Sequence, residues 1–466
     1  MNSFYTDSAV RKRLVEFLGG DVLEHATSAY ITCTDGCAYD PKALHFPSEL
    51  NWFLDRDLDI ARSLADDKYV LLHLDIEYVN FDAPSAAYLN PQRAFALQQP
   101  AVNVIETLLL EWGIRPLHLI TGQGHHFVWQ IARNSDLAAR ITALSPAPEL
   151  VPLCQERVPP LLQSRITADM QHTFSGIGLI MDYVAHRVKE VSAPLTDVPV
   201  EITAVHVGYD SAGLREMISI DISEYGDPLH TRMIRMPFTN YLKPKLTRLA
   251  GIMGMEGDTP ALRAIPLHEM DVNGALKVRL IEDDVRELAG RACVAIPEQE
   301  AGTLRLLEDY MGSRLRHFHE FYYSTQHDPK ETWSEKYGRT PLKKFPPCVR
   351  NILENPNDLL LKPAGMQLVS RSLLADGWHP RHIAGLIRSK FEDPSFGWGI
   401  DWNDYEAGTR ADFYVRTFTG LYATGQDQLV DFNCTSTQEK GFCCHPAEAG
   451  CCLESLYQTL SQRQFR

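Results

Sequence analysis

The sequence has 466 residues, of which 44% are hydrophobic and 23% are charged, as expected for a globular protein with room for two or three domains. It contains no run of eighteen apolar residues and no basic and apolar leader segment, so it predicts no membrane association and favours a cytoplasmic location. The formal net charge of −15 argues against a protein that binds nucleic acid non-specifically over its whole surface. Positive charge is local, because residues 232–248 hold five basic residues and no acidic one. Such a block suits phosphate groups.

The clearest predicted strand runs from Tyr69 to Val79 and follows a mixed, mostly helical N-terminal region. Side chains alternate between the faces of a strand, so Asp75 and Glu77 share one face while Leu74 and Ile76 share the other. The two carboxylates would lie roughly 7 Å apart, close enough to bind one or two divalent cations between them. The alternative is a strand that leaves the core and carries two solvated acids.

Two further segments carry helix signals. Pro100 at a first helical position and Gly113 after the last one predict a helix over residues 101–112. Residues 176–184 fit either a helix or a strand and include Asp182, an isolated acid to which the sequence gives no role.

A hairpin is predicted from two short apolar runs, residues 117–120 and 125–131, that flank a Gly-x-Gly turn. His126 would lie on the polar face of the second strand. Gly122 and Gly124 would bring backbone amides beside it, an arrangement that suits a phosphate oxygen. The alternative is a structural or solvated histidine.

A third alternating strand is predicted over residues 216–223, with Asp221 on its polar face. The basic block follows directly and includes Arg232, Arg235 and Lys243 among apolar residues. This mixture is typical of a packed scaffold that binds phosphates, and a solvated basic face is the alternative.

The remainder of the chain is predicted to be mostly helical. The stretch Arg314 to Tyr323 mixes aromatic and basic residues, which fits a core stripe or, less often, a surface that stacks bases. Pro346-Pro347-Cys348 marks a helix start. Further helices are predicted at residues 281–291, 301–310, 365–376, 379–392 and 406–422.

Cysteines gather near the C-terminus. Of ten cysteines, five lie in the tail: Cys434, Cys443, Cys444, Cys451 and Cys452. Because the cytosol keeps thiols reduced, the cluster indicates a metal site rather than disulfides.

The ordered set of Asp75-x-Glu77, Gly124-x-His126 and Ile220-Asp221 before an Arg-x-x-Arg block resembles the archaeo-eukaryotic primase superfamily, specifically its primase-polymerase branch. The likeness covers roughly residues 60–250. It implies an α/β (α+β) catalytic domain with an antiparallel or mixed sheet. The Pro-Pro-Cys helix start and the distal cysteines resemble the iron-sulfur domain of the primase large subunit, although the cysteine spacing of that domain is not reproduced.

The resemblance implies three units: a catalytic domain over residues 1–257, a helical linker over 258–338, and a helical domain with a cysteine metal cluster over 339–466. In the first unit Asp75, Glu77 and Asp221 would hold two Mg²⁺ or Mn²⁺ ions. His126, with the Gly122–Gly124 turn close by, would contact the incoming triphosphate. Arg232, Arg235 and Lys243 would neutralise phosphate or template charge.

In the last unit four thiolates would hold a 4Fe–4S cluster, with zinc as the alternative metal. The expected ligands are Cys348, Cys434, Cys443 and Cys451, with Cys444 and Cys452 as substitutes.

The expected activity is a nucleotidyltransferase that makes or extends a primer on single-stranded DNA from ribo- or deoxynucleoside triphosphates. The chain has no GxxxxGK(S/T) motif, so duplex opening would need a helicase partner or another replication or defence protein.

Two other functions stay open. A single-strand nickase of the replication-initiator type would need two histidines on the same face of one strand, whereas His125 and His126 are adjacent and face opposite ways. A catalytically inactive nucleic-acid-binding protein of the same fold is disfavoured by the three carboxylates on polar faces. These carboxylates repel one another, and an unused site would have no reason to keep them together.

Overall fold

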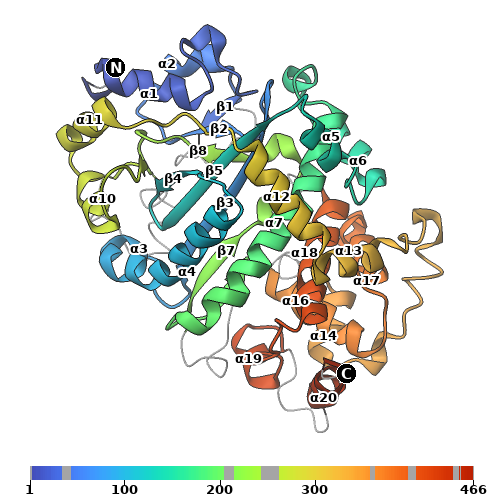
Figure 1. Ribbon diagram of the computed structural model, residues 1–466. Helices are drawn as coiled ribbons and strands as arrows, with labels where there is room; N and C mark the ends of the chain where they lie inside the picture. The colour runs from blue at the N-terminus through green and yellow to red at the C-terminus, as the bar shows by residue number, and fades with distance from the viewer. Residues whose placement is uncertain are drawn as a thin grey trace.

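The computed structural model describes residues 3–33, 44–203, 215–242, 262–356, 363–396, 406–443, 451 and 453–464. The chain forms a mixed α/β structure in which a central sheet is flanked by helices, with a second, smaller sheet and a helical C-terminal region (Figure 1). The expected fold class is confirmed at this level. In the described parts of the chain, every helix is too short or too polar to cross a bilayer.

The central sheet has six strands in the order β6-β7-β3-β5-β4-β9. All pairs are antiparallel except β6 with β7, which is parallel. The predicted strand and hairpin are confirmed, and the third strand is shorter than predicted because it ends at Asp221. The strand bounds are β3 (Tyr69–Asn80), β4 (Leu117–Ile120), β5 (Gly124–Ala132), β6 (Val200–Ile202), β7 (Glu216–Asp221) and β9 (Ile265–Pro266).

One face of this sheet is apolar and is covered by three helices, α4 (Pro91–Glu111), α7 (Ala168–Ser192) and α12 (Glu300–Met311) (Figure 1). Leu72, Leu74 and Ile76 of β3 are fully buried, as their alternation predicts. The other face carries the polar residues of the same strands. Burial of the apolar face fixes which way the polar residues point.

Helix α4 corrects one prediction, because it begins at Pro91 and Pro100 lies inside it. The side chain of Asn90 caps the helix by accepting a hydrogen bond from the Arg93 N–H. An interior proline removes one helical hydrogen bond, but the buried stripe that includes Phe95 continues through it and holds the helix together. Residues 176–184 lie in α7 and are therefore helical.

A three-stranded antiparallel sheet, in the order β1-β2-β8, stands opposite the polar face of the central sheet. Its strands are β1 (Ile31–Cys33), β2 (Ile60–Ser63) and β8 (Met233–Arg235). The outer helices are α1 (Ser8–Phe17), α2 (Leu50–Leu54), α3 (Ala86–Leu89), α5 (Asp136–Thr142), α6 (Val151–Glu156), α10 (Val272–Val278) and α11 (Glu282–Arg291).

The C-terminal region is helical, as predicted, and α18 lies at its centre against α13, α16 and α17. Its helices are α13 (Arg314–Tyr323), α14 (Pro347–Glu354), α16 (Pro363–Ala375), α17 (Pro380–Phe391), α18 (Ala407–Thr424), α19 (Cys434–Glu439) and α20 (Glu454–Gln464). Helix α13 buries Leu315, His319 and Tyr322, which agrees with the core interpretation of that aromatic stretch.

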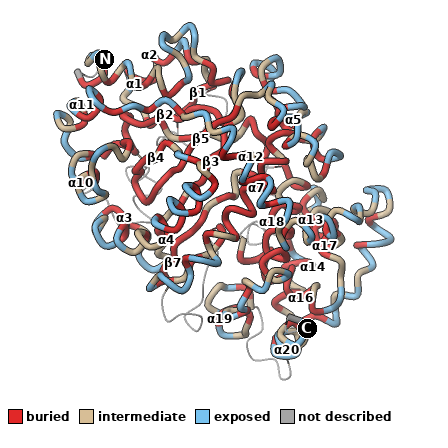
Figure 2. Tube along the Cα trace, viewed as in Figure 1, coloured by how far each residue is buried: buried red, intermediate tan, exposed pale blue. Residues whose placement is uncertain are grey.

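The sheet region and the C-terminal helices share one hydrophobic core (Figure 2). Strand β9, which follows residue 257, pairs with β4 in the central sheet, and α12 packs on β5. Residues on both sides of the predicted boundary at 257 therefore contribute to the same sheet, and the division into three units stays a prediction.

Candidate active site

Three predicted site residues form one row across the sheet. Asp75 on β3 stands directly opposite His126 on β5 and directly opposite Asp221 on β7. His126 Nε2 lies 3.4 Å from Asp75 Oδ1. Cα atoms of directly opposed antiparallel residues are separated by roughly 4.5–5.5 Å, so the carboxylates of Asp75 and Asp221 are close neighbours. The prediction of one shared site needs these three strands to lie side by side with their polar faces aligned, and they do.

This row opens into a cavity of about 200 Å³, here called the carboxylate cavity, between the polar face of the central sheet and the smaller sheet. Glu77, two residues after Asp75, lines the same cavity. Strand β2 contributes Ala61 and β8 contributes Arg235 to the opposite wall. The lining residues are Ala61, His73, Asp75, Glu77, Thr121, His126, Asp221, Ser223, Glu224, Arg232, Met233, Arg235 and Tyr241.

The surroundings shift the pKa values of the two histidines of the cavity in opposite directions. Burial lowers the pKa of His126 well below its usual value, and the nearby cations of His73 and Arg235 lower it further, so His126 is neutral near pH 7. Burial alone would also lower the pKa of His73, but the carboxylates of Glu224, Asp75 and Asp221 together outweigh it and the pKa is raised. Both Glu224 oxygens lie 3.0 Å from His73 Nδ1. The cavity therefore pairs a hydrogen-bonding neutral imidazole with a more basic one.

The two predicted arginines reach the cavity, and each already has an acidic partner. Arg232 forms an ion pair with Asp227, and Arg235 forms one with the fully buried Asp59. The guanidinium of Arg235 also lies 4.2 Å from the ring centroid of Tyr241, a cation–π contact. A phosphate in the cavity would therefore meet ordered guanidinium groups rather than flexible surface cations. Lys243 lies outside the described residues.

Gly122 and Gly124 serve close packing and do not line the cavity. A Cβ on Gly124 would overlap the carbonyl oxygen of Ile76 on β3, and a Cβ on Gly122 would overlap the ring of Tyr241. The carbonyl of Gly124 accepts a hydrogen bond from the Thr121 N–H at 2.9 Å. Only glycine allows the turn to approach β3 so closely, which brings His126 into register with Asp75.

The donors around the carboxylate cavity are carboxylate oxygens, the ligand type that Mg²⁺ and Mn²⁺ prefer. Across the ranges that the structure describes, no group of three or more His, Cys, Asp or Glu side chains is arranged to hold a metal ion. Asp75 and Asp221 are nevertheless neighbours by strand register, and Glu77 lines the same space. The donor chemistry thus fits a divalent cation, and binding would draw these side chains together.

Burial raises the pKa of the Cys348 thiol to about 12, and electrostatic interaction with Cys443, Cys451 and Cys434 raises it further, so the four cysteines of the expected metal set influence one another. Among the residues that the structure describes, these thiols are not arranged as a metal-binding group. The Leu453 N–H donates to Cys434 Sγ at 3.4 Å, which ties the end of the tail to α19.

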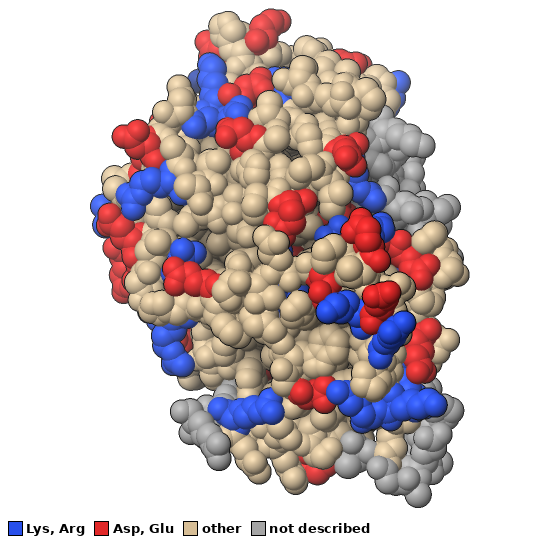
Figure 3. All heavy atoms as spheres, turned by 90° about the vertical axis from the view of Figure 1, so that its right-hand side faces the viewer, with Lys and Arg blue, Asp and Glu red and all other residues tan. Residues whose placement is uncertain are grey.

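The substitute ligands Cys444 and Cys452 lie outside the described residues. At the end of the molecule that carries α19 and α20, lysine and arginine side chains lie on both sides of an acidic group on the face shown in Figure 3. Elsewhere on that face the two signs of charge alternate.

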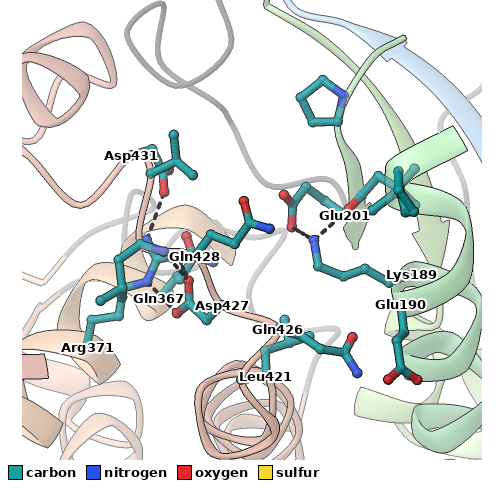
Figure 4. A pocket seen from close by; sticks show the side chains of 17 residues that line it. Lys189, Glu190, Glu201, Gln367, Arg371, Leu421, Gln426, Asp427, Gln428 and Asp431 are labelled. Atoms are coloured by element: carbon teal, nitrogen blue, oxygen red, sulfur yellow. Dashed lines mark hydrogen bonds and ion pairs between the residues drawn. The ribbon is translucent and has the colours of Figure 1, made fainter. Parts of the chain in front are cut away.

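A larger cavity, of about 450 Å³, lies between α7 with β6 and the segment after α18 (Figure 4). On one wall Lys189 contacts Glu201 at 2.8 Å, and on the other Arg371 contacts Asp427 at 2.6 Å and Asp431 at 2.9 Å. The remaining acids of the two walls are paired from outside the cavity, because Arg187 pairs with Glu190 and Lys440 pairs with Asp431. None of the predicted site residues lines this cavity, so the candidate chemistry belongs to the smaller one.

No family model matches this chain, and neither the curated proteins nor the solved structures include a significant match to it. The role of these residues therefore has to be inferred from their own geometry and chemistry.

Sequence reasoning missed several residues of the cavity, notably Glu224, Thr121 and Tyr241. Glu224 lies in the 3-10 helix η7 (Ser223–Gly226), where no strand alternation signals a face. His73 shares the alternation of Asp75, and that pattern could have identified it.

Proposed function

We propose that this protein is a template-dependent nucleotidyltransferase of the primase-polymerase type, acting at the carboxylate cavity. The observation that carries the proposal is the row His126, Asp75, Asp221 across three adjacent strands, with Glu77 in the same cavity. Three carboxylates that repel one another are costly to keep together unless a cation or a reaction uses them.

Divalent cations held by Asp75, Glu77 and Asp221 would activate the attacking hydroxyl and stabilise the leaving pyrophosphate. The chain itself supplies the rest. His126, neutral and next to Asp75, would donate a hydrogen bond to a phosphate oxygen. Arg232 and Arg235 would neutralise the phosphate charge of the bound triphosphate.

For the C-terminal region we propose a structural metal held by Cys348, Cys434, Cys443 and Cys451, either a 4Fe–4S cluster or zinc. The electrostatic influence of Cys434 on α19 and of Cys443 and Cys451 in the tail on Cys348 of α14 supports the ligand set.

The function is tested by nucleotide incorporation on a single-stranded DNA template, primed and unprimed, with ribo- and deoxynucleotides assayed separately. The double variant Asp75→Ala, Glu77→Ala should lose at least 10³-fold in rate, equivalent to about 4 kcal/mol of barrier. Asp82→Asn is the matched control, since Asp82 follows β3 but pairs with Arg215 outside the cavity.

Undiminished incorporation by the double variant would remove the proposal. Template binding by the wild type without any incorporation would favour the catalytically inactive alternative. A covalent adduct between protein and DNA would favour the nickase.

A further inference from the structure

The loop between Asp221 and Arg232 connects the carboxylates to a cation of the same cavity, and it is held from both sides. On the sheet side, the hydroxyl of Tyr225 donates to the carbonyl of His73 at 2.9 Å and accepts from its N–H at 3.1 Å. Asp221 Oδ1 accepts from the Ser223 N–H at 2.9 Å. The loop is therefore fixed to β3, and its first residues cannot shift without moving the cavity.

On its other side the loop rests on α18 of the C-terminal region. A Cβ on Gly226 would come within 2.7 Å of the Phe413 ring, so the backbone lies flush against the helix. Glu406 caps α18 by accepting from the N–H groups of Gly408 and Thr409, which fixes the first turn of the helix. The first turn of α18 carries Arg410.

Arg410 reaches the same carboxylate as Arg232. Arg410 Nη1 lies 2.9 Å from Asp227 Oδ1, and Arg232 pairs with Oδ2 of the same residue. The Asp227 side chain is only 2% exposed, whereas that of Arg232 is 22% exposed and lines the carboxylate cavity. Arg410 does not line the cavity. One buried negative charge is thus shared between two guanidinium groups, and the three residues carry a net charge of +1.

We propose that Arg410 is a positioning residue for the triphosphate, supplied by the C-terminal helices, which keeps the charge of Arg232 effective toward the cavity. This inference rests on the function proposed above and adds a role for the C-terminal region in it. Without Arg410, Asp227 and Arg232 form an electrically neutral pair that attracts a phosphate less strongly. With Arg410 present, part of the carboxylate's hydrogen-bonding capacity is taken up from the other side.

Arg410→Met tests this role, because methionine keeps much of the side-chain volume without the charge. The KM for nucleotide should rise about tenfold while kcat changes less than about threefold, the pattern expected when ground-state binding is lost. Affinity for inorganic triphosphate with Mg²⁺, measured by calorimetry, should fall by a similar factor. Arg388→Met is the control, since Arg388 on α17 is about as buried as Arg410, pairs with Glu392 just after that helix and lies outside the cavity.

A charge-compensating variant separates positioning from general stability. In the double variant Arg410→Met, Asp227→Asn, the carboxylate is gone and Arg232 again leaves a net charge of +1. Triphosphate affinity should return to within about threefold of the wild type, with thermal unfolding followed for every variant. A purely structural role for Arg410 predicts no such recovery, because the second substitution removes another contact.

The outcomes distinguish this inference from the function on which it rests. Unchanged triphosphate affinity in Arg410→Met, or failure of the double variant to recover it, would overturn the positioning role while incorporation by the wild type persists. A wild type that binds inorganic triphosphate but incorporates no nucleotide would overturn the proposed function and still test Arg410. A wild type that neither binds inorganic triphosphate nor incorporates nucleotide would overturn both the positioning role and the proposed function.

Discussion

The carboxylate cavity and the cysteine region are built by different means. In the cavity the backbone ladder of three adjacent strands sets the spacing of Asp75, His126 and Asp221. In the cysteine region the thiols come from two helices, α14 and α19, and from the tail, so their spacing depends on how these segments pack. A ladder fixes neighbours to within a fraction of a residue, because slipping by one position reverses every side chain. Helix packing tolerates larger shifts, so a bound metal has more to contribute there.

The comparison predicts that the two regions depend differently on their ligands. The sheet site should keep its geometry without a cation, since strand pairing and the buried face hold it. The cysteine region should lose stability without the proposed metal, since that metal would join segments from α14, α19 and the tail.

The largest expected effect is on the cysteine side. Cys348→Ser should abolish the bound metal and lower the free energy of unfolding by about 4 kcal/mol or more, part of the roughly 10–16 kcal/mol that zinc contributes in isolated zinc-finger peptides. Elemental analysis and chemical denaturation measure the two quantities. Cys293→Ser is the control, because Cys293 is exposed and lies far along the chain from the tail. Full metal occupancy in Cys348→Ser would contradict the ligand set.

A smaller effect tests the sheet side. Gly124→Ala places a methyl group against the carbonyl of Ile76 and should cost about 3 kcal/mol of stability, the upper part of the usual range for overpacking. Gly290→Ala is the matched control, since a Cβ there meets no described atom within 4 Å in α11, and it should stabilise by about 0.5–1 kcal/mol. Chemical denaturation measures both. An unchanged free energy of unfolding in Gly124→Ala would show that strand pairing does not fix the site as tightly as the ladder suggests.

The smallest effect concerns the junction between α7 of the sheet region and the C-terminal helices α13 and α18. There Asp182 on α7 is buried beside His186, His319 and Arg416. Burial lowers the pKa of His186 to about 4, despite the favourable charge of Asp182. As the pH falls below about 6.5, the unfolded chain takes up a proton that the folded protein refuses until pH 4, so stability falls. The loss between pH 7 and pH 5 should be about 2 kcal/mol.

His186→Gln should reduce this pH dependence, measured by chemical denaturation at pH 7 and pH 5. Asp182 acts in a lower window: its pKa is lowered to about 2, so its contribution is present above pH 3.8 and is lost as the pH falls toward 2. It therefore does not alter the comparison at pH 5. His25→Gln is the control, because His25 is exposed. If His186→Gln loses as much stability between pH 7 and pH 5 as the wild type, other groups cause that loss.

Much of the fold was predictable where one local pattern dominated. Alternation identified β3, the β4–β5 hairpin and β7, and glycine and proline signals identified most C-terminal helices. The predicted start of α4 was wrong because Pro91 and Pro100 give the same start signal, and the helix begins at Pro91, where Asn90 caps it. Helix or strand could not be decided for residues 176–184, since short apolar runs fit both.

The sequence by itself determined which residues can share a face: Asp75 and Glu77 on one strand, with His126 and Asp221 on the polar faces of two others. Side-chain alternation is a local property of the backbone and needs no partner. Only the tertiary structure decided that His126, Asp75 and Asp221 stand in one row. It also decided that Arg232 shares Asp227 with Arg410 of a distant helix. These contacts depend on strand register and helix packing between segments far apart in the chain, and no local pattern encodes them.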